Sequence, residues 1–310
     1  MLRVTSNMMN SQLLLNLNRN ARSMNETQIQ LSTGRKLNKP SDDPVGMTYS
    51  LRYRSELAEN EQYMKNVDSS ISWLDFNDTV LGQAGSVVQR LRELTVQAST
   101  GSNPQSALDS INEEIAQLKE QVVDIANSKL NGKYIFNGQK YNEKPYEFEV
   151  GSDGTYDTTA AASRLTDPGS IDYIVGESVK LKINVSGNEV FGSNEPKDEH
   201  DNLFTIINAL SQALKDGNTD AVSAQLDHID TRMEKILSVR SEIGAKTNRV
   251  ELMQGRLSDL ELNLTDLQSK TEDADYEKLI MTSKIQENIY NASLSVGAKI
   301  ISSSLVDFLR

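Results

Sequence analysis

Apolar residues recur at alternating spacings of three and four near both ends of the chain, and this pattern is missing from its middle. The pattern is the seam of a coiled coil. The six prolines, at positions 40, 44, 104, 145, 168 and 196, leave residues 1–39 and 197–310 uninterrupted. Because a proline in a helix interior costs about 3 kcal/mol, both ends of the chain are free to form long helices.

The first 130 residues predict three helices. The first covers residues 5–33 and ends at Gly34, which adopts the left-handed conformation at helix ends readily. The second begins at Pro44, with Asp43 as its N-cap, and continues to Ser99. The third covers residues 105–130, with apolar residues along one face.

Residues 133–198 have a different character. They are rich in β-branched and aromatic residues, and turn-forming sequences such as Asn137-Gly138 and Asp167-Pro168-Gly169 divide them. Residues 180–185 alternate polar and apolar side chains, as a half-buried strand does. We therefore predict a small β domain inserted between helices.

Helices return after the insert. A short one begins near Asp201, a very long one covers residues 220–271, and the last runs from residue 276 to the end. The acidic residues Glu272, Asp273 and Asp275 favour a new helix N-terminus through the helix dipole. The predicted fold is mainly α with a small β insert, and the two chain ends form a long antiparallel coiled-coil rod. We expect three domains: a terminal helical assembly domain (1–40 and 275–310), an α-helical rod domain (41–132 and 199–274) and the inserted β domain (133–198).

The last helix is apolar on more than one face. Ile285, Ile289, Ala292 and Val296 form one stripe, and a second stripe continues through its C-terminal part. A helix of this kind needs partners on several sides. The single helix at residues 5–33 can cover only one of the two stripes. The pattern therefore predicts contacts between the other stripe and neighbouring copies of the molecule.

Several seam positions of the predicted coiled coil are polar, and the sequence leaves two interpretations of them open. These side chains either lie at the partly exposed edge of the seam or set its register, since a buried polar group penalises shifted alignments. The positions are Gln28, Arg240, Thr247, Gln254 and Glu261.

Charge and amino-acid composition exclude several classes of function. The net charge of −12 does not suit binding to nucleic acid or to an acidic membrane, although residues 1–40 carry a local excess of basic side chains. Aromatic residues make up only 5% of the chain. Cysteine is absent, so disulfides, thiolate metal sites and cysteine nucleophiles are excluded.

No apolar run reaches the roughly 18 residues of a membrane span. The first residues do not resemble an ordinary secretory signal. An N-terminal segment with few acidic residues would also fit a transit peptide, but the apolar seam of this segment continues into the next one.

No group of residues indicates catalysis or cofactor binding. His200 and His228 each lack the second histidine that a zinc pair requires at a spacing of three to five residues. Ser41, Asp42 and Asp43 lack the ligand spacing of a calcium loop and fit helix capping instead. We therefore expect no enzyme, no cofactor and no metal.

Three segments closely resemble the bacterial flagellin family. LSTGRKLNKPSDDP at residues 31–44 is similar to the N-terminal signature of that family, and ANSKLNGKYIF at 126–136 to the segment where its members leave their helices. RSEIGAKTNR at 240–249 is similar to the returning helix of the family. The resemblance covers residues 1–140 and 200–310 and leaves most of the insert unmatched. Within the family, DADYE at 273–277, the ending SLVDFLR at 304–310 and the small insert favour the member at the hook–filament junction over flagellin itself.

The resemblance implies a structural subunit of the bacterial flagellum, exported unfolded and without a cleavable signal peptide to a site outside the cell. Its implied partners are copies of itself, other hook-associated proteins, flagellin, an export chaperone and the export apparatus, with no nucleic acid and no membrane insertion. The terminal helices would pack against those of neighbouring copies. The interface residues we expect are Leu13, Leu14, Leu17, Met24, Leu31, Ile285, Ile289, Leu294, Ile301, Leu305 and Phe308.

Two other interpretations remain open from the sequence. A flagellin-type filament subunit would have the same helical ends. A secreted coiled-coil protein that acts on membranes would also use a basic amphipathic N-terminal helix.

Overall fold

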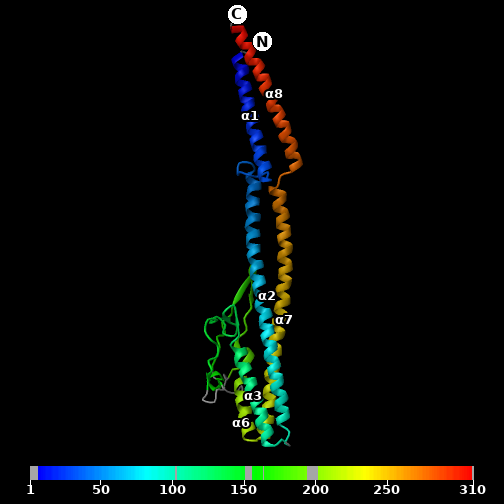
Figure 1. The fold of residues 1–310 in the computed structure, drawn as a ribbon. Helices are drawn as coiled ribbons and strands as arrows, with labels where there is room; N and C mark the ends of the chain where they lie inside the picture. The colour runs from blue at the N-terminus through cyan, green and yellow to red at the C-terminus, as the bar shows by residue number, and fades with distance from the viewer. Residues whose placement is uncertain (1–5, 102, 151–155, 163, 194–201, 309–310) are drawn as a thin grey trace. The chain divides into compact units, whose positions relative to one another are not determined.

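A computed structural model of the chain describes residues 6–101, 103–150, 156–162, 164–193 and 202–308 (Figure 1). Helices make up most of these residues, and the strands form small antiparallel sheets in the middle of the chain. The prediction of a mainly α fold with a small β insert is therefore confirmed.

The chain divides into two compact units. We call residues 1–60 with 259–310 the terminal unit, and residues 61–258 the central unit. The division into three functional domains stays a prediction.

The first two helices begin and end at the residues that their capping chemistry predicts. Helix α1 spans Ser6–Thr33, and Gly34 follows it with a φ of +72°. Helix α2 spans Pro44–Ala98. The Asp43 side chain caps α2, since its Oδ1 accepts hydrogen bonds from the backbone N–H groups of residues 45 and 46, both at 3.0 Å.

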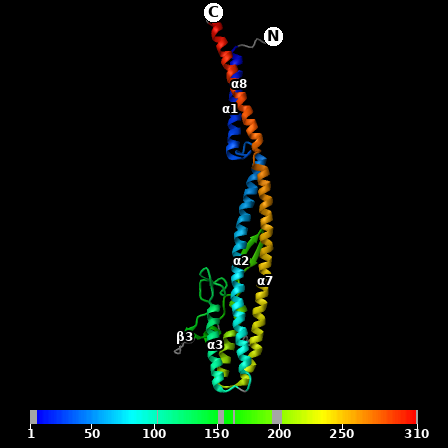
Figure 2. The same ribbon diagram turned by 45° about the vertical axis from the view of Figure 1, so that its right-hand side comes forward.

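Helix α7, Thr219–Glu272, runs antiparallel to α2 in the central unit (Figure 2). Hydrogen bonds between side chains join the two helices from Arg92 to Asp230 and from Arg240 to Asp78. One buried row of α7 repeats every seven residues. It comprises Val222, Ile229, Ile236, Ile243, Val250 and Leu257. A strict seven-residue repeat indicates the knobs-into-holes packing of a left-handed coiled coil.

Some of the polar seam positions lie at the exposed edge of the seam, and some also link the two helices in one register. The Arg240 guanidinium is about half-exposed and donates to Asp78 on α2 at 2.7 Å, and the Gln254 amide donates to Asp68 on α2 at 2.9 Å. These two positions therefore lie at the seam edge and also link the helices in one register. Gln28 and Glu261 are exposed.

Two further helices join the core of the central unit. Helix α3 spans Gln105–Ala126 and packs against α6, Leu203–Lys215. The prediction extended the third helix to residue 130, which is wrong by four residues. After Asn127 the chain forms a hairpin instead, in which strand β1, Lys129–Leu130, pairs with β2, Lys133–Tyr134.

The insert is less regular than a sheet domain. Two more hairpins follow, β3 (Glu149–Val150) with β4 (Tyr156–Asp157), and β5 (Asp172–Gly176) with β6 (Val179–Lys182). It also contains the short helices α4, Thr159–Ala162, and α5, Gly187–Phe191.

An aromatic cluster joins the insert to the helices. Phe136, Tyr146 and Phe191 of the insert pack with Phe204 of α6 at ring-centroid distances of 5.1–5.9 Å. The buried Arg232 of α7 donates to two backbone carbonyls of α5, each at 3.1 Å. The insert therefore shares one hydrophobic core with the helices of the central unit.

The last helix, α8, spans Tyr276–Phe308. Asp275 caps it, because its Oδ1 accepts from the backbone N–H of Lys278 at 3.1 Å. Glu272 differs from the prediction. It ends α7, with its side chain buried, and does not lie at the start of α8. No described helix is long and apolar enough to cross a membrane.

Candidate assembly interface

Helices α1 and α8 pack along each other within the terminal unit. On α1, the half-buried side chains include Leu13, Leu17, Met24 and Leu31. They follow the spacing of three and four that places residues on one helix face. Leu14, the fifth residue expected on this helix, is 60% exposed and lies outside the α1–α8 contact.

The face of α8 toward α1 mixes small and polar residues with Leu279 and Tyr290. Gly297 leaves room for Leu13, whose Cδ2 lies 2.9 Å from the position that a Cβ would take. The Gln286 amide donates to Ser23 Oγ at 2.8 Å, and the Tyr276 hydroxyl donates to the carbonyl of Leu31 at 3.1 Å. The pairing of α1 with α8 therefore half-buries aliphatic side chains of α1 against a face of α8 that contains few aliphatic side chains.

The aliphatic side chains of α8 point elsewhere. Five residues, spaced four, four, three and four apart, form one exposed stripe along this helix; we call them the α8 apolar stripe. They are Met281, Ile285, Ile289, Ala292 and Val296. Ile285 is 50% exposed and Ile289 is 45% exposed, although each is large and purely hydrophobic.

One exposed leucine lies on the other side of α8. At 3.6 residues per turn, Leu294 projects roughly opposite the α8 apolar stripe, and it is also 45% exposed. Ile301, Leu305 and Phe308 belong to the same helix, but their side chains lie outside the described residues.

The structure thus divides the predicted interface residues into three groups. Leu13, Leu17, Met24 and Leu31 are half-buried, whereas Leu14, Ile285, Ile289 and Leu294 are exposed. For the last three residues of the prediction only the helical backbone is described. The sequence pattern identified the apolar positions, but it did not show that Ile285 and Ile289 would lie outside the face of α8 toward α1.

The terminal unit leaves far more apolar surface uncovered than the central unit. Among the described residues it contains 17 of the 22 large hydrophobic side chains that are exposed. Contiguous exposed apolar surface on a soluble protein marks an interaction site. The α8 apolar stripe has this character along more than four helical turns.

Nothing in the described part of the chain supports a catalytic or metal site. No group of three or more histidine, aspartate or glutamate side chains in it could hold a metal ion. His228 lies within α7, and His200 is outside the described residues.

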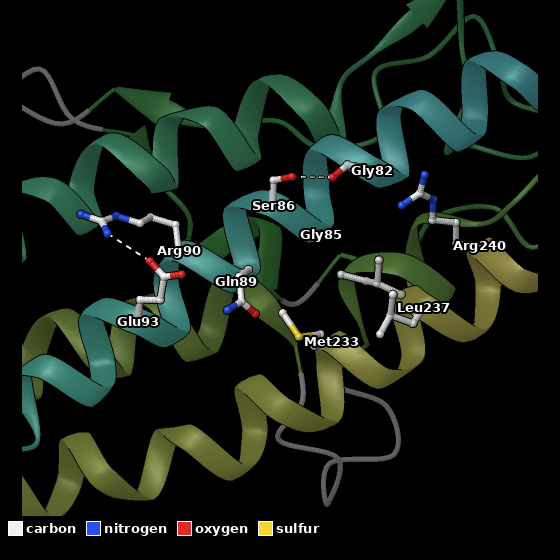
Figure 3. Close-up of a pocket in the computed structure, with 10 residues that line it drawn as sticks. Gly82, Gly85, Ser86, Gln89, Arg90, Glu93, Met233, Leu237 and Arg240 are labelled. Carbon is white, nitrogen blue, oxygen red and sulfur yellow. Dashed lines mark hydrogen bonds and ion pairs between the residues drawn. The ribbon is translucent and has the colours of Figure 1, made fainter.

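An open groove runs along α2 and α7 in the central unit (Figure 3). Gly82 and Gly85 shape one side of it, and Met233 and Leu237 line the other. Its two arginines already have partners, since Arg90 forms an ion pair with Glu93 and Arg240 with Asp78. Both guanidinium groups of the groove are therefore held in ion pairs.

The chain matches two models of one protein family. Residues 4–141 match the bacterial flagellin N-terminal helical region, and residues 226–309 match the bacterial flagellin C-terminal helical region.

Individual relatives are flagellar proteins. Flagellar hook-associated protein 3 of Escherichia coli is 26% identical over 276 residues, which cover 85% of this chain and 86% of that protein. Flagellin of Bacillus subtilis is 27% identical over 285 residues, 89% of each chain. Among solved structures, the flagellar junction protein FlgL from Legionella pneumophila is similar in fold, with a TM-score of 0.57 and 17% identity, and the match covers 74% of this chain and all of that one.

Proposed function

The chain belongs to the bacterial flagellin family, and from this premise we propose that it forms the junction between the hook and the filament of the flagellum. Proteins of this family are structural components of the flagellum, and they are not enzymes. The single observation that carries an assembly function is the exposed α8 apolar stripe, which no described residue of the subunit covers.

Two kinds of relative support the junction over other places in the flagellum. The hook-associated protein of Escherichia coli aligns along most of its length, and the similar fold in Legionella pneumophila is that of a junction protein. The sequences at residues 273–277 and 304–310, together with the small insert, favour the same assignment.

Assembly by the terminal helices follows from their packing. Burying a large aliphatic side chain completely contributes about 1.5–3 kcal/mol. The half-exposed residues of the α8 apolar stripe would therefore each contribute about 1 kcal/mol when a neighbouring copy covers them. The partners would be different surfaces of successive copies, which is the type of contact that builds rings and helical arrays. We propose Leu14, Ile285, Ile289 and Leu294 as the described residues at this interface, and Ile301, Leu305 and Phe308 as its continuation.

The route to the flagellum belongs to the same proposal. We expect export of the unfolded chain with the help of a chaperone. The complete lack of cysteine suits such a route, since no disulfide forms in transit.

The test uses a variant of the α8 apolar stripe and a matched control. Ile289→Asp places a charge on the stripe, whereas Leu252→Asp places one at an apolar residue of the central unit that is 77% exposed. In a strain lacking the protein, the control should restore swimming and Ile289→Asp should not, while both purified proteins keep the same helix content. Normal swimming with Ile289→Asp would contradict the proposed interface.

A filament subunit is the second candidate, because a flagellin is as similar in sequence as the hook-associated protein. Antibody labelling of isolated flagella separates the two. The junction predicts one short band at the hook tip, intact hooks on cells lacking the protein, and flagellin released into the medium. Label along the whole filament would favour the second candidate, and leakage of liposomes by the purified protein would favour a membrane-active one.

A further inference from the structure

The first hairpin of the central unit turns through an asparagine–glycine pair. Strand β1 pairs with β2 so that Leu130 lies opposite Lys133, which leaves Asn131 and Gly132 as a two-residue loop. Both loop residues have positive φ angles, +51° and +79°. Asparagine followed by glycine is the favoured sequence for such a loop, because a type I′ turn requires a positive φ at both central positions. The fold therefore gives this pair a structural role.

The Asn131–Gly132 loop is exposed and loosely surrounded. Both residues are exposed, and beyond the neighbouring residues no atom in the described part of the chain lies within 4 Å of the position that a Cβ on Gly132 would take. The hydrogen bond across a type I′ turn uses the N–H of the fourth residue, here Lys133. The N–H of Gly132 is therefore not part of the ladder, and the peptide between the two loop residues is not held by packing.

The second asparagine–glycine pair of the chain is enclosed instead. Asn137 is 5% exposed, and its side-chain nitrogen donates to the carbonyls of Lys140 and Glu143, each at 3.1 Å. Its Oδ1 accepts from the backbone N–H of Asp167 at 3.2 Å. A Cβ on Gly138 would overlap the carbonyl oxygen of Asp167. The same dipeptide thus occurs once in an exposed loop and once locked inside the insert.

An asparagine that precedes glycine can deamidate without an enzyme, because glycine has no Cβ to obstruct ring closure. At this loop the backbone nitrogen of Gly132 would attack Cγ of Asn131. A C–N bond forms, the bond from Cγ to the side-chain nitrogen breaks, and ammonia leaves with the proton of the attacking nitrogen. Water then opens the succinimide ring at either carbonyl and leaves aspartate or isoaspartate. The net change converts an amide and water into a carboxylate and ammonium, so no oxidant or other co-reactant is needed.

The rate at each site depends on how readily the backbone opens around it. The attack requires Asn131 to leave its turn conformation for a moment, so that its side chain reaches the Gly132 nitrogen. Exposed loops open at little cost in free energy, whereas buried and hydrogen-bonded segments open only together with larger parts of the fold. All three hydrogen bonds of the Asn137 side chain would have to break before it could react.

We propose that Asn131 is a site of spontaneous deamidation in the folded protein and that Asn137 is protected from it. This modification does not depend on the proposed function, because it requires only the loop and water.

The two products differ in their effect on the hairpin. Either one adds a negative charge between Lys129 and Lys133, whose ammonium groups lie 4.4 and 4.5 Å from the centroids of aromatic rings. Isoaspartate also carries the main chain through the former side chain, which lengthens the loop by one carbon atom. A two-residue loop depends on its exact backbone conformation, so the isoaspartate form should lose the pairing of β1 with β2.

The test follows both asparagines in one peptide. The purified full-length protein is incubated at mildly alkaline pH in water enriched in heavy oxygen, which the hydrolysis step incorporates. Cleavage after glutamate releases residues 121–143, which contain both asparagine–glycine pairs, and fragment ions in mass spectrometry locate the heavy oxygen. A parallel sample in urea is the matched control, because the fold no longer distinguishes the two sites there.

In the folded protein Asn131 should convert about tenfold or more faster than Asn137, and in urea the two rates should agree within about threefold. Similar rates at the two sites in the folded protein would overturn the proposal. Conversion of Asn131 in urea alone would also overturn it, because the folded loop would then be protected.

A second measurement tests the effect on the hairpin. Asn131→Asp supplies the charge of the product with an unaltered backbone. Protein that has gained this charge by ageing, isolated by anion exchange, should contain a population that has lost the protection of residues 129–134 against hydrogen exchange. Asn131→Asp should keep this protection. Equal protection in the two samples would show that the predicted loss of β1–β2 pairing is wrong.

Discussion

The two units of the molecule use their apolar residues in opposite ways. Of the 45 buried hydrophobic residues described, only Leu37 and Leu264 belong to the terminal unit, whereas that unit contains 17 of the 22 large hydrophobic residues that are exposed. The central unit therefore completes its core within one chain. The terminal unit forms helices without completing a core. Polar bonds, such as those from Ser50 and Arg54 to the buried Glu272, help to stabilise it, and we expect partners outside the subunit to stabilise it further.

The largest effect should come from removing the terminal helices altogether. Deleting residues 1–40 and 275–310 should leave a soluble, folded monomer that no longer binds to hooks. The core of the central unit contains none of the deleted residues, so its thermal unfolding should persist. Circular dichroism during heating measures this, and a truncated protein that is unfolded at 25 °C would contradict the division into two units.

Substitutions of a large apolar side chain by alanine should lower the free energy of unfolding much more in the central unit than in the terminal unit. Leu81→Ala removes a fully buried side chain of the central unit and should lower the free energy of unfolding by about 2–5 kcal/mol. Ile285→Ala removes a half-exposed side chain and should change it by less than about 0.5 kcal/mol. Urea denaturation of the monomers gives both values. Similar losses from the two variants would show that α8 is covered within the subunit.

Acid should weaken the terminal unit in particular. The pKa of Glu272 is about 2 in the folded protein against an ordinary value of 4.5, so its stabilisation is complete above pH 4.5 and is lost as the pH falls toward 2. The full effect is about 3 kcal/mol. The protection of the amides in residues 34–36 and 272–274 against hydrogen exchange, measured relative to the intrinsic rate at each pH, should therefore fall over this range.

Glu272→Gln removes the titrating group and should flatten this pH dependence, whereas the exposed Glu261→Gln on the same helix should not. An unchanged pH profile in Glu272→Gln would show that other carboxylates control the stability of residues 34–36 and 272–274.

The smallest effect should come from the links across the seam of the central unit. A double-mutant cycle on Arg240→Ala and Asp78→Ala should give a coupling energy of about 0.2–1 kcal/mol, because both side chains are nearly half-exposed. The coupling should weaken at high salt. A coupling above 2 kcal/mol would indicate that this pair is a principal determinant of the register.

The sequence predicted the helices of both units well, for clear physical reasons. Proline and glycine positions define where helices stop, and Asp43 with Pro44 specifies the start of α2 through its own hydrogen bonds. The insert was harder to predict because its short strands lack a long repeat. Its core depends on aromatic contacts between residues as distant in sequence as Tyr146 and Phe204.

The candidate interface was only partly predictable. Periodicity identified Leu13 and Ile285 as apolar helix positions, but it could not show that α8 would turn Gln286 and Gly297 toward α1 and leave Ile285 exposed. The burial of the Glu272 carboxylate among Ser50, Arg54 and Arg35 was not predicted. One signal was present in the sequence, since an acidic residue at the C-terminal end of a helix opposes the helix dipole and needs a compensating partner.

The seven-residue repeat of α7 also limits how such a protein changes in evolution. Inserting one residue into this helix would rotate every later side chain by about 100° and would remove Ile243, Val250 and Leu257 from the seam together. The packing between α2 and α7 is preserved only when seven residues, or a multiple of seven, are gained or lost in α7 and the same number in α2. Differences in length among homologous chains should therefore accumulate between residues 129 and 202, where turns absorb them without disturbing either long helix.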